Sequence, residues 1–207
     1  MPSPALLGLV GGIGAGKSHV SKLFAELGAH VIAADAFGHE ALRQPEIKAQ
    51  AVEYWGEGIL DAEGHIDRRT LGRIVFADEA ERKTLERLVF PWIENRIRSE
   101  LGTAQAHPAV PLLVLDAAIM MESGWSGICD AIVFVDAPAE VRWERVARDR
   151  HWTREEWERR EASQLDLAAK RRAAHHVVVN AGDEVETRRQ VAELFDRYAQ
   201  PRERLSP

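Results

Sequence analysis

The sequence is poor in several features that mark particular classes of protein. Cys129 is the only cysteine among 207 residues, so an internal disulfide is excluded and a reducing compartment is expected. No apolar stretch approaches the roughly 20 residues of a membrane helix. No basic region precedes the first apolar run, so the sequence gives no sign of a signal peptide. We therefore expect a cytoplasmic protein without a membrane partner.

The sequence also lacks an excess of positive charge. The 27 Lys and Arg residues are outnumbered by 33 Asp and Glu residues, and the net charge of −6 argues against a general nucleic-acid binder. No His and Cys residues have the spacing of a zinc site. The adjacent His175 and His176 would point to opposite faces of a strand. We expect no nucleic-acid partner. The sequence sets no oligomeric state, and a monomer is compatible with it.

What the sequence does contain is a glycine-rich segment, residues 11–18, with the pattern G-x-x-x-x-G-K-S. Glycines let backbone N–H groups surround phosphate oxygens, Lys17 reaches the β- and γ-phosphates of a nucleotide, and the Ser18 hydroxyl can bind Mg²⁺. An apolar run precedes the segment, and apolar residues at helical spacing follow it up to Gly28. The alternative is a flexible glycine-rich turn, which would need neither a strand before it nor a helix after it. We predict an ATP site formed by Gly12, Ile13, Gly14, Ala15, Gly16, Lys17, Ser18 and the following His19.

Apolar runs predict one parallel sheet of about five strands, flanked by helices in an α/β fold of the P-loop NTPase type. The predicted strands cover residues 5–10, 30–34, 110–116, 131–136 and 175–180. Helices are expected at residues 36–43, 139–150 and 185–198.

Residues 36–106 are helical in pattern and poor in strand signals. Asp67 is expected to cap one of their helices, and Phe90-Pro91 to interrupt or kink the last one. The sequence thus divides into three parts. They are a nucleotide-binding core of residues 1–35 with 107–149 and 173–207, a helical substrate-binding insertion of residues 36–106, and a helical lid of residues 150–172.

Two carboxylates follow predicted strands, at the sheet edge where open α/β sheets bind ligands. Asp35 has the position of a base for an acceptor hydroxyl, or of a helix N-cap. Asp116 has the position of a Mg²⁺ ligand, or of an ordinary cap at a strand end. Glu122 is a further carboxylate near the same edge.

Arginine is concentrated near the predicted lid. A solvated face balanced by glutamates explains most of these residues, while one or two are expected to reach the transferring phosphoryl group when a lid closes. The cluster comprises Arg142, Arg145, Arg148, Arg150, Arg154, Arg159 and Arg160.

Taken in order, these residues resemble one family, the dephospho-coenzyme A kinases, over almost the whole chain. Residues 8–18 are similar to the family's G-L-T-G-G-I-G-S-G-K-S, and residues 32–35 to its I-D-A-D. Residues 55–76 follow its F-G…I-L…G…L-D-R…L…V-F signature, and residues 114–122 its L-D-V-P-L-L-F-E segment. The lid pattern R-x-x-R…R-x-x-x-x-Q and a later Asn fall on Arg145, Arg148, Arg159, Gln164 and Asn180.

The resemblance implies transfer of the ATP γ-phosphoryl group to the 3′-hydroxyl of dephospho-coenzyme A, the last step of coenzyme A synthesis. It implies Asp35 as the base, Lys17 and Arg148 as catalytic cations, and ATP and Mg²⁺ as donor and cofactor. It also implies Arg145 and Asn180 at the nucleotide, and Ser18 and Asp116 at the metal. The substrate residues it implies are Arg68, Glu122, Arg159 and Gln164.

Three positions depart from the family pattern. Ala33 replaces the first Asp of I-D-A-D, Phe90 replaces the His of a His-Pro pair, and residues 118–121 replace P-L-L-F. A kinase for another small acceptor, such as a nucleoside monophosphate or a sugar acid, shares the same core and stays open. So does a non-catalytic ATP-binding regulator. A GTP switch is disfavoured because N-K-x-D is absent.

Overall fold

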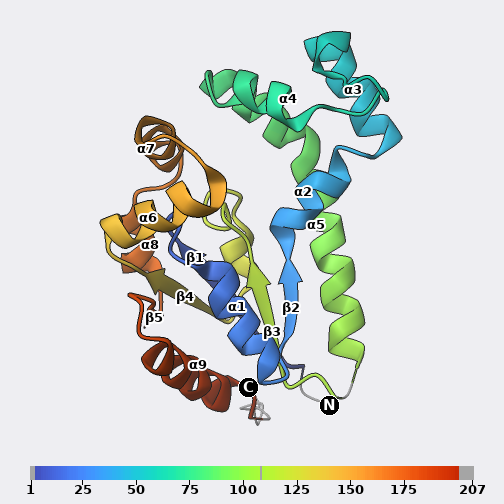
Figure 1. The fold of residues 1–207 in the computed structure, drawn as a ribbon. Coiled ribbons are helices and arrows are strands. Elements are labelled where there is room, and N and C mark those ends of the chain that lie inside the picture. Colours follow the sequence, from blue (N-terminus) through green and yellow to red (C-terminus); the bar gives the residue numbers. More distant parts are fainter. Residues whose placement is uncertain (1–2, 108, 201–207) are drawn as a thin grey trace. The chain divides into compact units, whose positions relative to one another are not determined.

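The computed structural model describes residues 3–107 and 109–200. Its centre is a five-stranded sheet in the order β2-β3-β1-β4-β5, with every neighbouring pair parallel (Figure 1). The strands are β1 Ala5–Gly11, β2 His30–Ala33, β3 Leu112–Asp116, β4 Ala131–Asp136 and β5 His176–Val179. Each falls on an apolar run of the sequence. The predicted α/β class and the predicted strand number are confirmed.

Parallel pairing requires long connections between strands, and all of these contain α-helices except the one between β3 and β4, which runs through turns and a short 3₁₀ segment. The helices are α1 Lys17–Glu26, α2 Ala34–Ala41, α3 Pro45–Trp55, α4 Arg68–Val75, α5 Glu79–Ala106, α6 Ala139–Arg150, α7 Arg154–Ala162, α8 Leu167–Ala173 and α9 Glu184–Tyr198. Short 3₁₀ turns cover Glu57–Ile59 and Trp125–Ile128. No helix within the described residues has both the length and the apolar composition needed to cross a bilayer.

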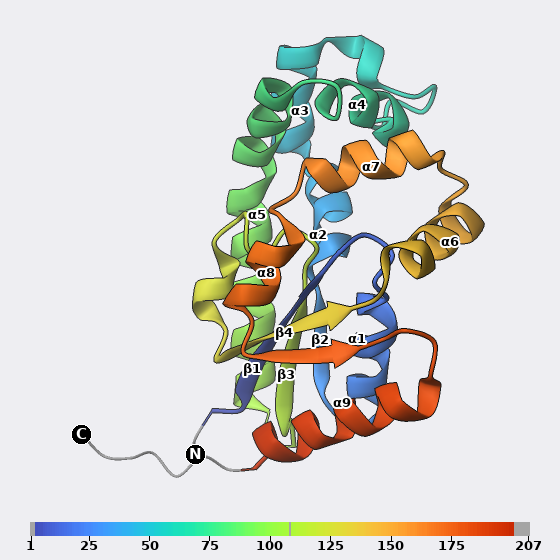
Figure 2. The ribbon, with the colours of Figure 1, turned by 90° about the vertical axis from the view of Figure 1, so that its left-hand side faces the viewer.

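The sheet is apolar on both faces, as expected for a parallel sheet covered on both sides. On one face, Leu7 and Leu9 are fully buried in a cluster with Phe24 of α1 and Val191 of α9. Helix α9 lies beside α1 and β5 (Figure 2). Because side chains alternate along a strand, Gly8 faces the other way, and a side chain there would collide with Met120 and Cys129.

The chain forms two compact units, Met1–Ala33 with Glu100–Pro207, and Ala34–Ser99. One boundary follows β2, and the other lies inside the long helix α5. The smaller unit is helical, with a core that includes Ile59, Leu71 and Val75. Asp67 is the N-cap of helix α4, as predicted, and its side chain accepts a hydrogen bond from the Arg69 N–H at 2.9 Å.

Two local expectations need correction. Helix α5 is not interrupted at Phe90-Pro91, because it continues through Pro91 to Ala106, and only the alternative of a kink stays a prediction. Buried Val89 and Ile93 flank the proline, and their packing offsets the hydrogen bond that proline removes. Asp35 is not an N-cap, because α2 begins at Ala34 and Asp35 lies in its first turn.

Candidate active site

The glycine-rich segment is the loop between β1 and α1, and its backbone requires the glycines. Gly14 and Gly16 have φ values of 83° and 88°, a region that side-chain-bearing residues rarely adopt. Gly16 immediately precedes α1 and has left-handed geometry. The loop therefore ends at a helix N-terminus, where backbone N–H groups and the helix dipole favour an anion.

Arg145 of α6 and Asn180, which follows β5, hold the carbonyl side of this loop. The Ala15 carbonyl accepts the Asn180 side-chain amide at 2.8 Å and Arg145 Nη1 at 3.2 Å, and the Gly14 carbonyl accepts Arg145 Nη1 at 3.4 Å. Arg145 Nη2 also donates to the Asn180 carbonyl at 3.0 Å. In a trans peptide the N–H points away from the C=O, so the Gly16 N–H is directed to the opposite side of the loop.

A second group of side chains, from α6 and α7, holds the Ile13 carbonyl. Arg142 Nη1 donates to it at 3.3 Å and Trp157 Nε1 at 3.4 Å. Arg142 is ion-paired with Glu161, and its guanidinium lies 5.2 Å from the Trp157 ring. Sequence reasoning missed this group, because it treated Arg142 as one of a solvated cluster. Its spacing of three from Arg145, on one helix face, was the available signal.

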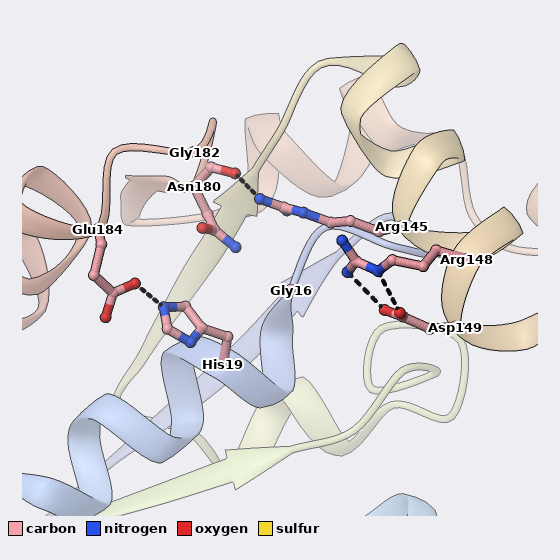
Figure 3. A pocket seen from close by; sticks show the side chains of 8 residues that line it. All are labelled: Gly16, His19, Arg145, Arg148, Asp149, Asn180, Gly182 and Glu184. Carbon is pink, nitrogen blue, oxygen red and sulfur yellow. Dashed lines mark hydrogen bonds and ion pairs between the residues drawn. The ribbon is translucent and has the colours of Figure 1, made fainter.

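A cavity of about 410 Å³ lies beside the loop (Figure 3). It is lined by Gly16, His19, Arg145, Arg148, Asp149, Asn180, Gly182 and Glu184. Five of the residues predicted to bind or act on the nucleotide thus line one cavity: Gly16, His19, Arg145, Arg148 and Asn180.

Two pairs of side chains that line the cavity contact each other. His19 Nε2 lies 2.8 Å from Glu184 Oε2, and Arg148 donates to Asp149 at 2.7 and 3.1 Å. The hydrogen bonds that Arg148 donates to the Asp149 carboxylate raise the pKa of Arg148. Burial, and then the neighbouring charge of Arg148, lowers the pKa of Arg145. Each arginine keeps its charge at neutral pH, because a guanidinium group loses its proton only in strong base.

Lys17 and Asp116 lie at the same end of the sheet as the loop. Lys17 Nζ donates to the Gly11 carbonyl at 3.2 Å. Asp116 is the last residue of β3, lies opposite Leu9 in the register with β1, and is 7% exposed. It accepts the Ser21 hydroxyl of α1 at 3.0 Å. The bond joins this carboxylate to the helix that begins with Lys17 and Ser18.

Glu122 and Gln164, predicted as substrate residues, meet around Lys170 of α8. Lys170 Nζ lies 2.8 Å from Glu122 Oε1 and donates to Gln164 Oε1 at 3.1 Å. The Leu165 N–H donates to the same Glu122 oxygen at 2.8 Å. The sequence analysis did not single out Lys170, which looks like any other helical lysine in the printed sequence.

Asp35 and Arg68 belong to the smaller unit. Asp35 is exposed in the first turn of α2, and Arg68 is exposed at the start of α4. His39, one turn after Asp35, senses both charges. Burial and the Arg68 charge lower the pKa of His39, while Asp35 opposes them. The smaller unit therefore brings the predicted base and the predicted substrate arginine near one histidine.

Three of the seven arginines of the cluster are in ion pairs near the surface, as the solvated-face interpretation predicts. Arg148 pairs with Asp149 at 2.7 Å, Arg154 with Glu140 at 2.7 Å and Arg160 with Glu156 at 2.9 Å. Pairs of this kind contribute little stability. Arg159 is exposed on α7. Arg142 and Arg145 differ from these residues, because they hold the loop carbonyls.

Comparison with known proteins decides the family. The model of the dephospho-CoA kinase family matches residues 5–186. The chain belongs to the dephospho-CoA kinase family. The dephospho-CoA kinase of Methylococcus capsulatus is 37% identical over 94% of this chain and 96% of its own length. That of Aquifex aeolicus is 35% identical over 92% and 95%.

The crystal structure of a Thermus thermophilus protein has the same fold, with a TM-score of 0.79. It is 32% identical to this chain and covers 93% of it and 96% of its own chain. The resemblance inferred from residues 8–180 is therefore confirmed, and so is the class of the protein as a P-loop kinase.

Proposed function

We propose that this kinase transfers the γ-phosphoryl group of ATP to the 3′-hydroxyl of dephospho-coenzyme A. The observation that carries the proposal is the loop of residues 11–18, whose carbonyls are held by Arg142, Arg145, Asn180 and Trp157. A loop held in this way is preorganised for phosphate before ATP arrives. Preorganised donors are worth most in phosphoryl transfer, where the protein supplies positioning and charge stabilisation.

ATP is proposed to occupy the cavity beside Gly16, with its phosphates on the loop. Lys17 would neutralise charge on the β- and γ-phosphates, and Arg145 and Arg148 would add positive charge from α6. His19, directly after Ser18, would contact the nucleotide from the start of α1. The Gly12, Ile13, Gly14 and Ala15 backbone would complete the phosphate site.

Mg²⁺ is proposed as the cofactor, held by Ser18 and Asp116. Among the described residues no three His, Cys, Asp or Glu side chains form a metal cluster. Mg²⁺ does not need such a cluster, because it binds through one or two protein oxygens, water and substrate phosphates. A hydroxyl and a carboxylate at the sheet edge fit that chemistry. When bound, the ion would supply positive charge against the charge that develops on the phosphate oxygens.

The acceptor is proposed to be held by residues 36–106, including Arg68, with Asp35 orienting the 3′-hydroxyl and accepting its proton. Residues 150–172 would form the lid, with Arg159 and Gln164 facing the substrate and Glu122 supporting it. Ala33 and Phe90 stand where the family pattern has Asp and His, so the residues just named would have to act without those two side chains. The reaction needs only small molecules, and ATP as donor supports a cytoplasmic location.

The test is release of ADP from ATP and Mg²⁺ in the presence of different acceptors. We expect release with dephospho-coenzyme A, and none above background with nucleoside monophosphates or sugar acids. Stimulation by one of those instead would replace the acceptor, and ATP binding without any stimulated release would point to a regulator. Lys17→Ala shows whether the release comes from this site.

A further inference from the structure

Lys170 is completely buried, whereas the next two residues of α8, Arg171 and Arg172, are exposed. Lysine is among the residues least often found inside a protein, because removing an ammonium from water is costly unless it is paired. The lysine is absent from the lining of the nucleotide cavity. Its burial therefore calls for an explanation separate from ATP binding.

The surroundings of Lys170 satisfy its charge and its donors. Its Nζ lies 2.8 Å from Glu122 Oε1, 3.1 Å from Gln164 Oε1 and 3.5 Å from the Ala118 carbonyl. An ammonium has three N–H donors, and three oxygens surround it here. The Glu122 side chain is itself only 22% exposed, so loss of the lysine would leave a largely buried carboxylate without its cation.

These partners come from two segments distant in sequence. Ala118 and Glu122 lie in the turns that follow β3, and Ala118 is only two residues after Asp116. Gln164 follows α7, and the N–H of Leu165 donates to Glu122 at 2.8 Å. One ammonium and one carboxylate thus tie the segment after the proposed metal ligand to the end of the proposed lid helix.

Stability alone is a poor explanation for this arrangement. Replacing a buried ion pair by apolar side chains of similar volume is often neutral or stabilising, so such a pair is weak evidence of a stabilising role. A pair that instead fixes the relative position of two functional segments has a reason to be ionic, because charged hydrogen bonds constrain geometry more strictly than apolar contacts.

We propose that Lys170 is a positioning residue for phosphoryl transfer. It fixes the segment that follows Asp116 and the end of α7 in one arrangement, acting through Glu122 and Gln164 without touching ATP. The proposal rests on the proposed function, because its effect appears in turnover. A misplacement of about 1 Å can cost roughly 10²-fold in rate.

Lys170→Met tests it, since methionine keeps a long unbranched side chain and removes the charge. We expect kcat to fall by roughly ten- to a hundredfold, with the KM for ATP changed less than about twofold because the loop of residues 11–18 is held by other side chains. Arg189→Met is the control. Arg189 of α9 also forms an ion pair, at 2.6 Å from Glu186, but it is 55% exposed and lies outside the segments proposed to bind ATP or the acceptor.

Amide hydrogen exchange supplies a readout that a general loss of stability would not imitate. In Lys170→Met, exchange is expected to quicken in residues 117–123 and 163–167 while residues 11–18 stay as protected as in the unsubstituted protein. If Lys170→Met does not fold, the double substitution Glu122→Gln with Lys170→Met leaves no unpaired charge and carries the same test.

A kcat within about twofold of the Arg189→Met protein, in either folded Lys170 variant, overturns the proposal. Exchange that quickens equally in all segments overturns it as well. If the unsubstituted protein shows no release of ADP that depends on dephospho-coenzyme A, the proposed function fails instead. Amide hydrogen exchange in residues 117–123 and 163–167 then still shows whether Lys170 holds the two segments.

Discussion

The side-chain amide of Asn180 donates a 2.8 Å hydrogen bond to the carbonyl of Ala15, 165 residues earlier in the chain. Asn180 is 5% exposed, and its own N–H donates to the Asp136 carbonyl at 2.7 Å. The end of β5 is thereby fixed to the phosphate loop. The contact explains how an asparagine far from the loop in sequence comes to line the cavity beside it.

Asn180→Asp should weaken ATP binding. The substitution places a buried carboxylate oxygen against the Ala15 carbonyl, where the amide donor had been, so the loop must shift to relieve the repulsion. We expect the Kd for ATP to rise about tenfold or more, equivalent to at least about 1.4 kcal/mol. Calorimetric titration with ATP measures it. Asn95→Asp, the same substitution at an exposed asparagine of α5, should bind ATP normally.

Asp35→Asn should separate catalysis from donor binding. The amide keeps the size of the side chain but cannot accept the hydroxyl proton, so kcat should fall about 10²- to 10⁴-fold. Binding of ATP should be unchanged. Steady-state kinetics and an ATP titration measure the two effects. The control is Asp78→Asn, at another exposed carboxylate of the same compact unit. Near-normal turnover of Asp35→Asn would contradict the role of Asp35 as the base.

Lys17→Ala should remove most of the activity without unfolding the protein. The ammonium donates to the Gly11 carbonyl and is the cation that the loop offers to the β- and γ-phosphates. We expect kcat/KM to fall by about 10² or more, as for other single charge-stabilising donors. The assay is ADP release over a range of ATP concentrations. Unchanged kcat/KM would contradict the role given to Lys17.

His176 should make the protein less stable in mild acid. Burial, and then the charge of Arg197, lowers the pKa of His176 below 6.5, while its Nε2 lies 2.7 Å from the Tyr198 hydroxyl. The unfolded chain therefore binds this proton at higher pH than the folded chain. Stability is retained above pH 6.5 and decreases as the pH falls through that value.

Thermal unfolding at a series of pH values measures this effect. His176→Asn removes the titration, so its Tm should change less between neutral and mildly acidic pH than that of the unsubstituted protein. His65 is exposed, and His65→Asn provides the comparison. Equal slopes for His176→Asn and the unsubstituted protein would show that His176 does not govern this loss.

Cys129 should be unreactive while the protein is folded. Its Sγ lies 3.8 Å from the Trp125 carbonyl and 3.9 Å from Met120 Sδ, and burial raises the pKa of the thiol from 9.0 to about 12. The reactive thiolate is therefore about 10³-fold scarcer than in an unperturbed thiol. A maleimide should label the protein only in denaturant. Complete labelling of the folded protein within minutes would contradict the burial of Cys129.

The sheet and the phosphate loop were predictable because their signals are local. Strands buried on both faces are continuous apolar runs, and the glycines of residues 11–18 are required by the loop backbone itself. Asp67 also caps the N-terminus of its helix, as the sequence pattern predicted. These features depend on residues close together in the chain, which is what a sequence pattern records.

The charged residues that hold the site were not predictable in the same way. Arg142 and Lys170 are long cationic residues on helices, where exposure is the usual outcome. Their burial depends on partners such as the Ile13 carbonyl, 129 residues away from Arg142, and Glu122, which no local pattern connects to Lys170. Pro91 is the converse case, because packing on both sides overrides a strong local signal.

The central claim is that this protein phosphorylates the 3′-hydroxyl of dephospho-coenzyme A. The most direct measurement is identification of the product after incubation with ATP, Mg²⁺ and dephospho-coenzyme A. The account predicts that the acceptor gains one phosphoryl group by mass, and that ³¹P NMR shows a phosphomonoester on the ribose 3′-oxygen. An unmodified acceptor, or a phosphoryl group on any other atom, would contradict it.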